Sequence, residues 1–221
     1  MNKNSYYYKY LKYKKKYFNA SKIQNGGNIS NSLWIKEDFF SQNEFEDILN
    51  DLNELKPKED KRSSNRCSLC INKEKYKNIY DKIYKNEKFI SFMNSIKDDN
   101  VRLKLEPSYP IEYRKYFTGS KGMDWHQDTS MFEPDCFEIV LTLTNNSDSK
   151  FEWMDGLVKN SVSPKPNTLA IVRPKSVIHS VSPVNNGERT ILKFIMEFIE
   201  DGKEDNTKKI SLDKEIDNCP I

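Results

Sequence analysis

The chain has 221 residues, of which 31% are charged and 36% are hydrophobic, and its formal net charge is +3. This size suits one domain with flanking segments. No apolar run approaches the ~20 residues that a membrane-spanning helix needs, and no apolar stretch typical of a secretory signal follows the basic start. We therefore expect a soluble, intracellular protein of the cytoplasm, with a virus-infected cell or a virion as the alternative location.

Residues 1–36 are expected to form a separate basic leader. They contain eight lysines and no acidic residue, and six of the twelve tyrosines lie within the first 17 residues. This composition offers few aliphatic side chains for burial and predicts a flexible segment. Its lysines and tyrosines also suit an anionic partner such as nucleic acid, because lysines pair with phosphates and tyrosines stack on bases.

Residues 37–100 are predicted to be largely helical. Ser41 and Glu44 form the pattern of a capping box, and apolar residues follow at helical spacing until Pro57 ends the helix. The remaining elements predicted here are a charged loop over 57–72 and helices over 76–83 and 89–96.

From residue 101 onward, apolar and polar residues alternate, which is typical of strands with one buried face. The alternation is clearest over residues 101–105, 137–143 and 192–198. Helices followed by many short strands predict an α+β fold. For residues 101–199 we expect a double-stranded β-helix, which is a jelly-roll or cupin-like core, with the N-terminal helices packed against it. Residues 200–221 are expected to form a charged tail.

The four cysteines do not suggest a metal site. Cys67 and Cys70 form a single CxxC pair, while Cys136 and Cys219 are isolated. A structural zinc site normally uses a second pair of ligands at similar spacing. We therefore expect reduced cysteines with ordinary structural roles.

The two histidines of the chain stand in a pattern that suggests iron chemistry. His126 and Asp128 are two residues apart, so on an extended segment their side chains point the same way. His179 follows 53 residues later. Two histidines and one carboxylate on one face of an octahedral metal form the facial triad of non-haem Fe(II) oxygenases, which leaves positions open for O₂ and a second ligand. Arg189 follows ten residues after His179, and its guanidinium can hold a carboxylate bidentately.

This part of the sequence resembles a known family. The segment YFTGSKGMDWHQD, the distal histidine and the arginine within LAIVRPKSVIHSVSPVNNGERTILKF are similar to the 2-oxoglutarate- and Fe(II)-dependent dioxygenases, especially the prolyl-4-hydroxylase-like branch. The resemblance covers residues 101–199. It implies that His126, Asp128 and His179 are the catalytic iron ligands. It also implies Fe(II), 2-oxoglutarate as co-substrate and O₂, with ascorbate as an accessory reductant.

The same resemblance predicts how the co-substrate is held. It implies that Arg189 anchors the distal carboxylate of 2-oxoglutarate and that Tyr116 is a second contact. Thr142 is a further candidate, because it lies on the polar face of its predicted strand. Arg114 and Arg173 are the alternative cations if Arg189 is not the anchor.

The leading functional hypothesis is an oxidoreductase that hydroxylates a side chain of a protein or peptide. A second hypothesis keeps this chemistry but acts on a nucleobase or a small molecule. The body of the chain after the leader has 28 basic and 33 acidic residues, which argues against a long polynucleotide track. A third hypothesis is a non-catalytic jelly-roll binding module, which has no need for an intact triad.

Overall fold

The computed structural model describes residues 31–205 and 208–209. Residues 1–30 of the predicted leader and most of the predicted tail lie outside the described residues, and so does the predicted nucleic-acid contact of the leader. Within residues 31–205 no helix is both long enough and apolar enough to cross a membrane.

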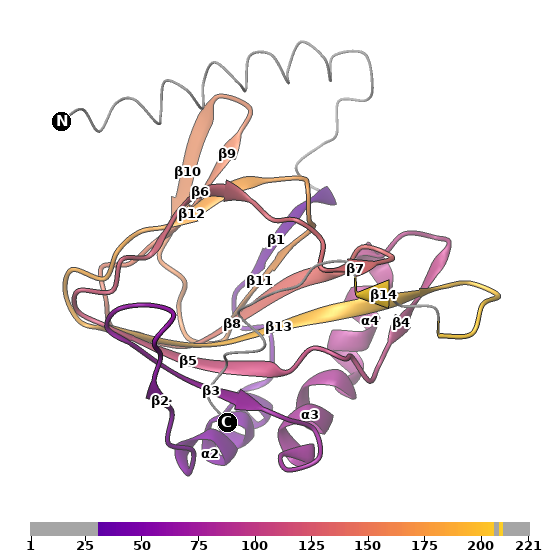
Figure 1. Cartoon of the computed structure of the whole chain (residues 1–221), viewed down its shortest axis with the longest axis horizontal. Coiled ribbons are helices and arrows are strands. Elements are labelled where there is room, and N and C mark those ends of the chain that lie inside the picture. Colours follow the sequence, from indigo (N-terminus) through magenta and orange to yellow (C-terminus); the bar gives the residue numbers. More distant parts are fainter. Residues whose placement is uncertain (1–30, 206–207, 210–221) are drawn as a thin grey trace.

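Two antiparallel sheets face each other and form the double-stranded β-helix that the sequence predicts (Figure 1). The larger sheet has eight strands in the order β1-β11-β8-β13-β5-β3-β2, with β4 also paired to β13. Its strands are β1 (Leu33–Lys36), β2 (Lys58–Glu59), β3 (Arg66–Ile71), β4 (Val101–Lys104), β5 (Ile111–Phe117), β8 (Phe137–Asn145), β11 (Thr168–Val172) and β13 (Glu188–Glu200).

The smaller sheet has four strands in the order β10-β9-β12-β6. They are β6 (Met123–Gln127), β9 (Phe151–Asp155), β10 (Val158–Val162) and β12 (Ile178–Val181). A separate two-stranded pair joins β7 (Phe132–Glu133) to β14 (Lys208–Lys209).

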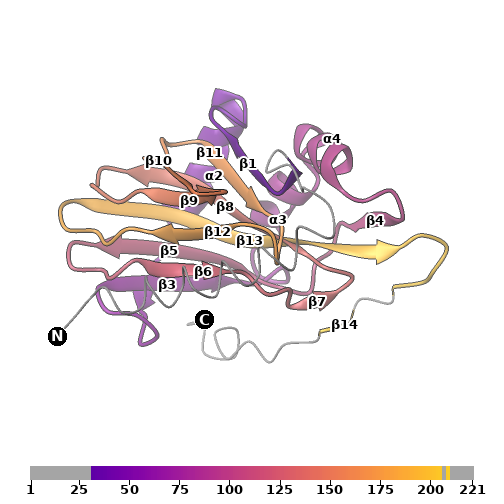
Figure 2. The same cartoon turned by 90° about the horizontal axis from the view of Figure 1, so that it is seen from above.

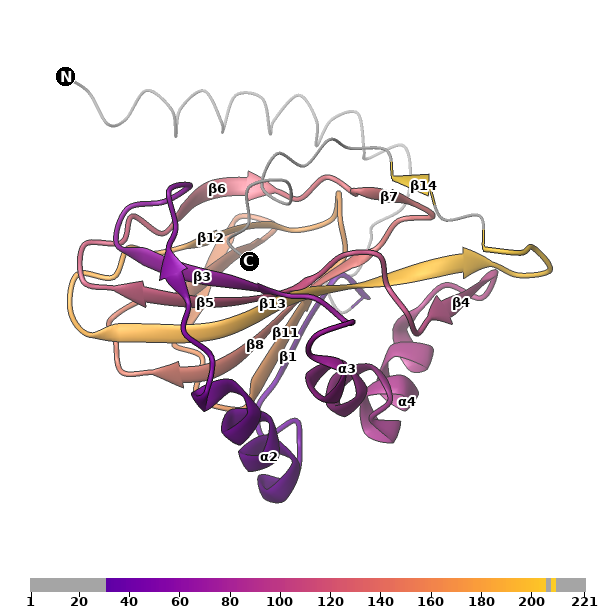
Figure 3. The same cartoon turned by 60° about the horizontal axis from the view of Figure 1, so that its bottom comes forward.

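Three helices cover the outer face of the larger sheet, on the side opposite the smaller sheet (Figure 3). They are α2 (Gln42–Asn53), α3 (Lys77–Tyr84) and α4 (Glu87–Ile96). The predicted capping box is present at the start of α2, where Ser41 and Glu44 bond each other's backbone N–H groups. Apolar side chains of the helices pack on the sheet and form the main core.

Strand β13 runs through the middle of the larger sheet (Figure 2). Its side chains alternate between the two faces of that sheet. Leu192 and Phe194 are fully buried in the core shared with the helices. Arg189, Ile191 and Lys193 alternate with them and line a cavity between the two sheets. The period of two therefore places the predicted anchor on the inner face of the roll.

Three expectations need correction. The stretch predicted as a charged loop over 57–72 contains β2 and β3, because a hairpin adds both strands to the edge of β5. The last residues assigned to the leader form β1, which pairs with β11. Cys70 is disulfide-bonded rather than reduced, whereas Cys67 and Cys136 carry free thiols.

Candidate metal centre

Backbone pairing in the smaller sheet brings the two histidines together. His126 on β6 and His179 on β12 are direct antiparallel partners, so their side chains share one face. Gly122 allows this pairing just before β6, because any Cβ there would collide with the carbonyl oxygen of Val181. Asp128 follows β6 and points to the same place. Its Oδ1 lies 3.2 Å from Nε2 of His126, and its Oδ2 lies 3.5 Å from Nε2 of His179.

The geometry of these three side chains suits a cation. One ligating atom from each lies within 4.8 Å of the others. Nδ1 of His126 lies 2.7 Å from the carbonyl oxygen of Asp124, and Nδ1 of His179 lies 3.1 Å from that of Val177. These carbonyls fix the protonated nitrogen at Nδ1 and leave both Nε2 lone pairs aimed at the centre. Nε2 of His126 is buried and faces Oδ1 of Asp128, so both atoms are directed at the point where a metal would be bound.

The pKa shifts of Asp128 and His179 favour metal binding, whereas the hydrogen bond with Asp128 raises the pKa of His126. Burial acts to raise the pKa of Asp128, but its hydrogen bond with His126 and the charge of His179 outweigh burial and lower the pKa. Burial also lowers the pKa of His179, which favours its neutral form. An ionised carboxylate beside a neutral imidazole is the protonation state in which both groups bind a metal. The side chain of His126 is 30% exposed, so the centre is open to one side.

All three residues predicted to hold the co-substrate line a cavity that two of the predicted metal ligands also line. Arg189, Tyr116 and Thr142 share this cavity with Asp128 and His179. Arg189 on β13 stands directly opposite Tyr116 on β5. Apolar side chains form much of the remaining wall. One of them is Phe151, whose ring centre lies 5.6 Å from that of His179.

Arg189 is a buried cation without a counter-ion. Its exposed fraction is 6%, and it makes no ion pair within the described part of the chain. Its Nε is buried and has no hydrogen-bond partner there. Burial lowers the pKa of Arg189, and Tyr116 opposes this shift. Because a buried charge without a partner is costly, the cavity favours an anionic ligand at this point.

The two alternative cations are less suitable. Arg173 pairs with Asp98 and lies over the ring of Phe137, and it does not line the cavity. Arg114 does line the cavity, but its Nε and Nη2 both bond Oε2 of Glu112 at 2.9 and 2.8 Å. Among these three arginines, the one ten residues after His179 is the best placed to hold a ligand carboxylate.

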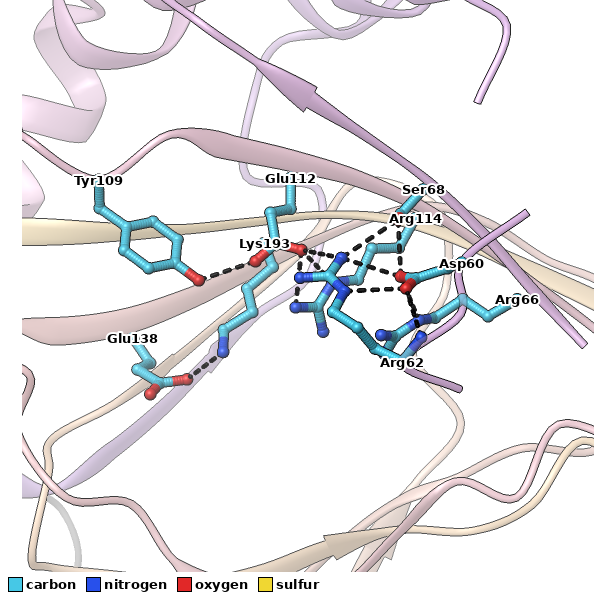
Figure 4. Close-up of polar contacts among 9 residues, drawn as sticks. All are labelled: Asp60, Arg62, Arg66, Ser68, Tyr109, Glu112, Arg114, Glu138 and Lys193. Atoms are coloured by element: carbon cyan, nitrogen blue, oxygen red, sulfur yellow. Dashed lines mark hydrogen bonds and ion pairs between the residues drawn. The ribbon is translucent and has the colours of Figure 1, made fainter. Parts of the chain in front are cut away.

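Sequence reasoning missed a charged pair in the cavity wall. Lys193 and Glu138 lie 3.1 Å apart, and both line the cavity (Figure 4). Glu138 interrupts the apolar strand β8, and Lys193 interrupts the apolar strand β13. A charged residue within an apolar strand is the sequence signal that could have identified this pair. A charge in the middle of a buried strand requires a partner or a ligand.

The sequence matches no protein-family model and no curated relative. Solved structures match it by fold. An oxidoreductase of the 2OG-Fe(II) oxygenase family from Burkholderia pseudomallei aligns with a TM-score of 0.59 at 14% identity, over 78% of this chain and 91% of that chain. HygX from Streptomyces hygroscopicus was solved with nickel, 2-oxoglutarate and hygromycin B bound. It aligns with a TM-score of 0.58 at 8% identity, over 80% of this chain and 86% of that chain. A prolyl hydroxylase from Trichoplax adhaerens was solved in complex with a peptide fragment of hypoxia inducible factor. It aligns with a TM-score of 0.55 at 15% identity, over 77% of this chain and 84% of that chain.

The chain has the fold of the 2-oxoglutarate- and Fe(II)-dependent oxygenases. This confirms the predicted double-stranded β-helix, and it confirms the resemblance to these oxygenases, prolyl hydroxylases included, at the level of the fold. The oxygenase fold alone assigns no role to single residues. Those roles depend on the geometry of the triad and of the cavity beside it.

Proposed function

We propose that the chain is a 2-oxoglutarate- and Fe(II)-dependent oxygenase that holds iron through His126, Asp128 and His179. One observation carries the proposal: the three ligating atoms converge within 4.8 Å, and two of the three residues, Asp128 and His179, line a cavity together with Arg189, which has no ion pair within the described part of the chain. Two imidazoles and a carboxylate on one side of a metal leave the remaining positions open. A non-catalytic binding module has no need for such an arrangement.

Bound iron would supply O₂ activation coupled to the oxidative decarboxylation of 2-oxoglutarate. The residues of the chain bind and orient the reactants. Arg189 holds the distal carboxylate, and Tyr116 and Thr142 line the same space and limit how the co-substrate sits. The apolar wall around Phe151 and Val181 excludes water from the reacting centre. The exposed side of His126 leaves a route for the substrate.

For the substrate we propose a side chain of a protein or peptide. The support is the prolyl hydroxylase from Trichoplax adhaerens, which shares this fold and was solved with a peptide fragment. A small molecule is the alternative, because HygX shares the same fold and was solved with hygromycin B.

The experiment is a succinate-release assay with purified protein, Fe(II), O₂ and 2-oxoglutarate, with and without ascorbate. Peptide pools and small-molecule pools serve as separate substrate sets. We expect succinate formation that one pool stimulates and that Asp128→Ala abolishes. Succinate formation at the same rate in Asp128→Ala would remove the triad from the mechanism.

A further inference from the structure

The charged pair in the cavity wall, Lys193 and Glu138, is used neither by the proposed metal centre nor by the co-substrate anchor. Both side chains line the cavity, as Asp128 and His179 do. Burial acts to raise the pKa of Asp128, and the charge of Lys193 is among the influences that lower it. Burial lowers the pKa of His179, and the charge of Glu138 is among the influences that oppose burial. Because such effects weaken with distance, the pair lies near the triad.

The strands hold this pair apart from the co-substrate anchor. Lys193 lies on β13 four residues after Arg189, and Glu138 lies on the neighbouring strand β8. Arg189, Ile191 and Lys193 share the inner face of the sheet, and at ~3.3 Å per residue the backbones of the two cations are roughly 13 Å apart. The cavity therefore has a lone cation at one point of β13 and a separate ion pair further along the same strand.

The ion pair retains hydrogen-bonding capacity. Nζ of Lys193 lies 3.1 Å from Oε2 of Glu138 (Figure 4), and within the described residues neither side chain has another ion pair or a hydrogen bond. The side chains are 15% and 18% exposed, so a ligand in the cavity can reach them. An ammonium has three N–H donors, and a carboxylate can accept several hydrogen bonds. A ligand that offers both an acceptor and a donor would use this remaining capacity.

The charges of the pair select the kind of ligand. They cancel each other, in contrast to the charge of Arg189. A ligand carboxylate at this point would be repelled by Glu138, and a ligand ammonium would be repelled by Lys193. A neutral group with one acceptor and one donor can bond both partners at once. The peptide amide is such a group, because its carbonyl oxygen can accept from an ammonium while its N–H donates to a carboxylate.

We propose that Lys193 and Glu138 bind a backbone amide of a peptide substrate and so hold the substrate beside the metal centre. The inference rests on the proposed function and deepens it, because it names two substrate-binding residues and the group that they recognise. Stability alone is a poor reason for two charges in this wall, since apolar residues of similar volume usually stabilise a protein as well as a buried ion pair does.

The test combines protein variants with modified peptides. The probe is the peptide that most stimulates succinate release in the peptide pools, with each backbone amide replaced in turn by an ester. An ester keeps the carbonyl and lacks the N–H. With the unchanged protein, the ester at the recognised position should raise the peptide concentration for half-maximal stimulation roughly 10- to 100-fold, as for the loss of a charge-assisted hydrogen bond.

The variant Glu138→Met/Lys193→Met replaces the ion pair with apolar side chains of similar length. It should bind the all-amide peptide roughly 10- to 100-fold more weakly than the unchanged protein does, and the ester at the recognised position should then cause little further loss. Its loss of 2-oxoglutarate affinity, measured by calorimetry on Ni(II)-loaded protein, should be at least tenfold smaller than its loss of peptide affinity.

Lys104→Met is the matched control. Lys104 also pairs with a β13 carboxylate, Glu197, at 3.1 Å and is 13% exposed, but it does not line the cavity. This variant should keep the full effect of the ester. If the double methionine variant fails to fold, Glu138→Gln carries the comparison, and its ester effect should be reduced because a neutral acceptor bonds about half as strongly.

An ester effect of equal size in the unchanged protein and in a folded variant, at every position of the peptide, would overturn the inference. A loss of 2-oxoglutarate affinity as large as the loss of peptide affinity would also overturn it, and so would stimulation by the small-molecule pools alone. Absence of 2-oxoglutarate binding by the unchanged Ni(II)-loaded protein would instead overturn the proposed function itself.

Discussion

At the scale of single residues, Arg189 has the environment that most clearly requires a ligand. Its guanidinium is buried beside Tyr116, and no carboxylate of the described chain neutralises it. Iron can chelate the 2-oxo acid end of many compounds, so chelation does not select among them. The distal carboxylate distinguishes 2-oxoglutarate, and a fixed cation must offset the cost of burying it.

The first prediction concerns this anchor. Arg189→Ala should raise the 2-oxoglutarate concentration required for half-maximal succinate release by a few hundredfold, because loss of a buried charge partner costs ~3–5 kcal/mol. The 2-oxoglutarate requirement of Arg189→Lys should lie between those of the unchanged protein and Arg189→Ala. Iron binding should be unchanged in both variants. An unchanged 2-oxoglutarate requirement in a folded Arg189→Ala protein would transfer the anchoring role to another cation.

The second prediction concerns the metal ligands. His179→Ala removes one of three converging ligand atoms, so it should lower the affinity for Ni(II) or Fe(II) by at least tenfold. Metal content after desalting measures this. The control is Lys175→Ala, because the backbone of Lys175 bonds that of Asp128 while its side chain pairs with Asp135 and offers no ligand. Metal retention by His179→Ala at the level of the unchanged protein would exclude His179 from the centre.

At the scale of elements, the β2–β3 hairpin and β5 are joined by buried charge. Burial acts to raise the pKa of Glu112, but Arg114, Lys193, the hydroxyl of Tyr109 and Arg62 outweigh burial and lower this pKa to about 2. A carboxyl whose pKa is lowered on folding stabilises the folded state above its unfolded pKa. That stabilisation is lost as pH falls through the folded value.

The third prediction follows from the lowered pKa of Glu112. At pH 7, Glu112→Gln should lower the free energy of unfolding by ~3–5 kcal/mol, because it removes a buried carboxylate that pairs with Arg62 and Arg114. The difference from the unchanged protein should shrink as pH falls from about 4.5 toward 2. Urea unfolding across this range measures it. Glu106→Gln, which breaks an exposed ion pair with Lys73, is the control and should have little effect. A difference that stays constant with pH would contradict the role given to Glu112.

The sequence predicts some elements of this fold well and others poorly, for physical reasons. The capping box at Ser41 and the alternation in β13 depend on local chemistry, and both are found in the structure. The hairpin over 58–71 was missed because its many charged residues suggest an exposed loop. In the structure Arg66 pairs with Asp60 inside the hairpin, and Arg62 pairs with Glu112, which is distant in sequence. Spacing predicts that His126 and Asp128 point the same way, whereas the position of Arg66 opposite Tyr116 depends on strand order, which spacing does not reveal.

At the scale of the whole molecule, β1 marks where the folded part of the described chain begins. Trp34 on β1 stacks on Phe137 with ring centres 5.7 Å apart and packs against the main core. Removal of β1 should therefore lower the free energy of unfolding.

The fourth prediction compares two truncations. Deletion of residues 1–30 should leave the midpoint of thermal unfolding and the 2-oxoglutarate turnover unchanged, because none of the proposed ligands lies there. Deletion of residues 1–36 also removes β1 and should lower stability by ~2 kcal/mol or more, because it exposes the surface that Trp34 covers. Equal stability of the two truncated proteins would show that β1 contributes little.

The central claim is that iron and 2-oxoglutarate meet in this cavity, held by the triad and Arg189. The most direct test is an anaerobic titration of 2-oxoglutarate into the Fe(II)-loaded protein, followed by visible absorption. Chelation of Fe(II) by a 2-oxo acid produces a charge-transfer band, and no substrate is needed to observe it. The account predicts a saturable band in the unchanged protein, no band in His179→Ala, and a band at much higher 2-oxoglutarate concentration in Arg189→Ala. The absence of any band in a folded, iron-loaded, unchanged protein would contradict the account.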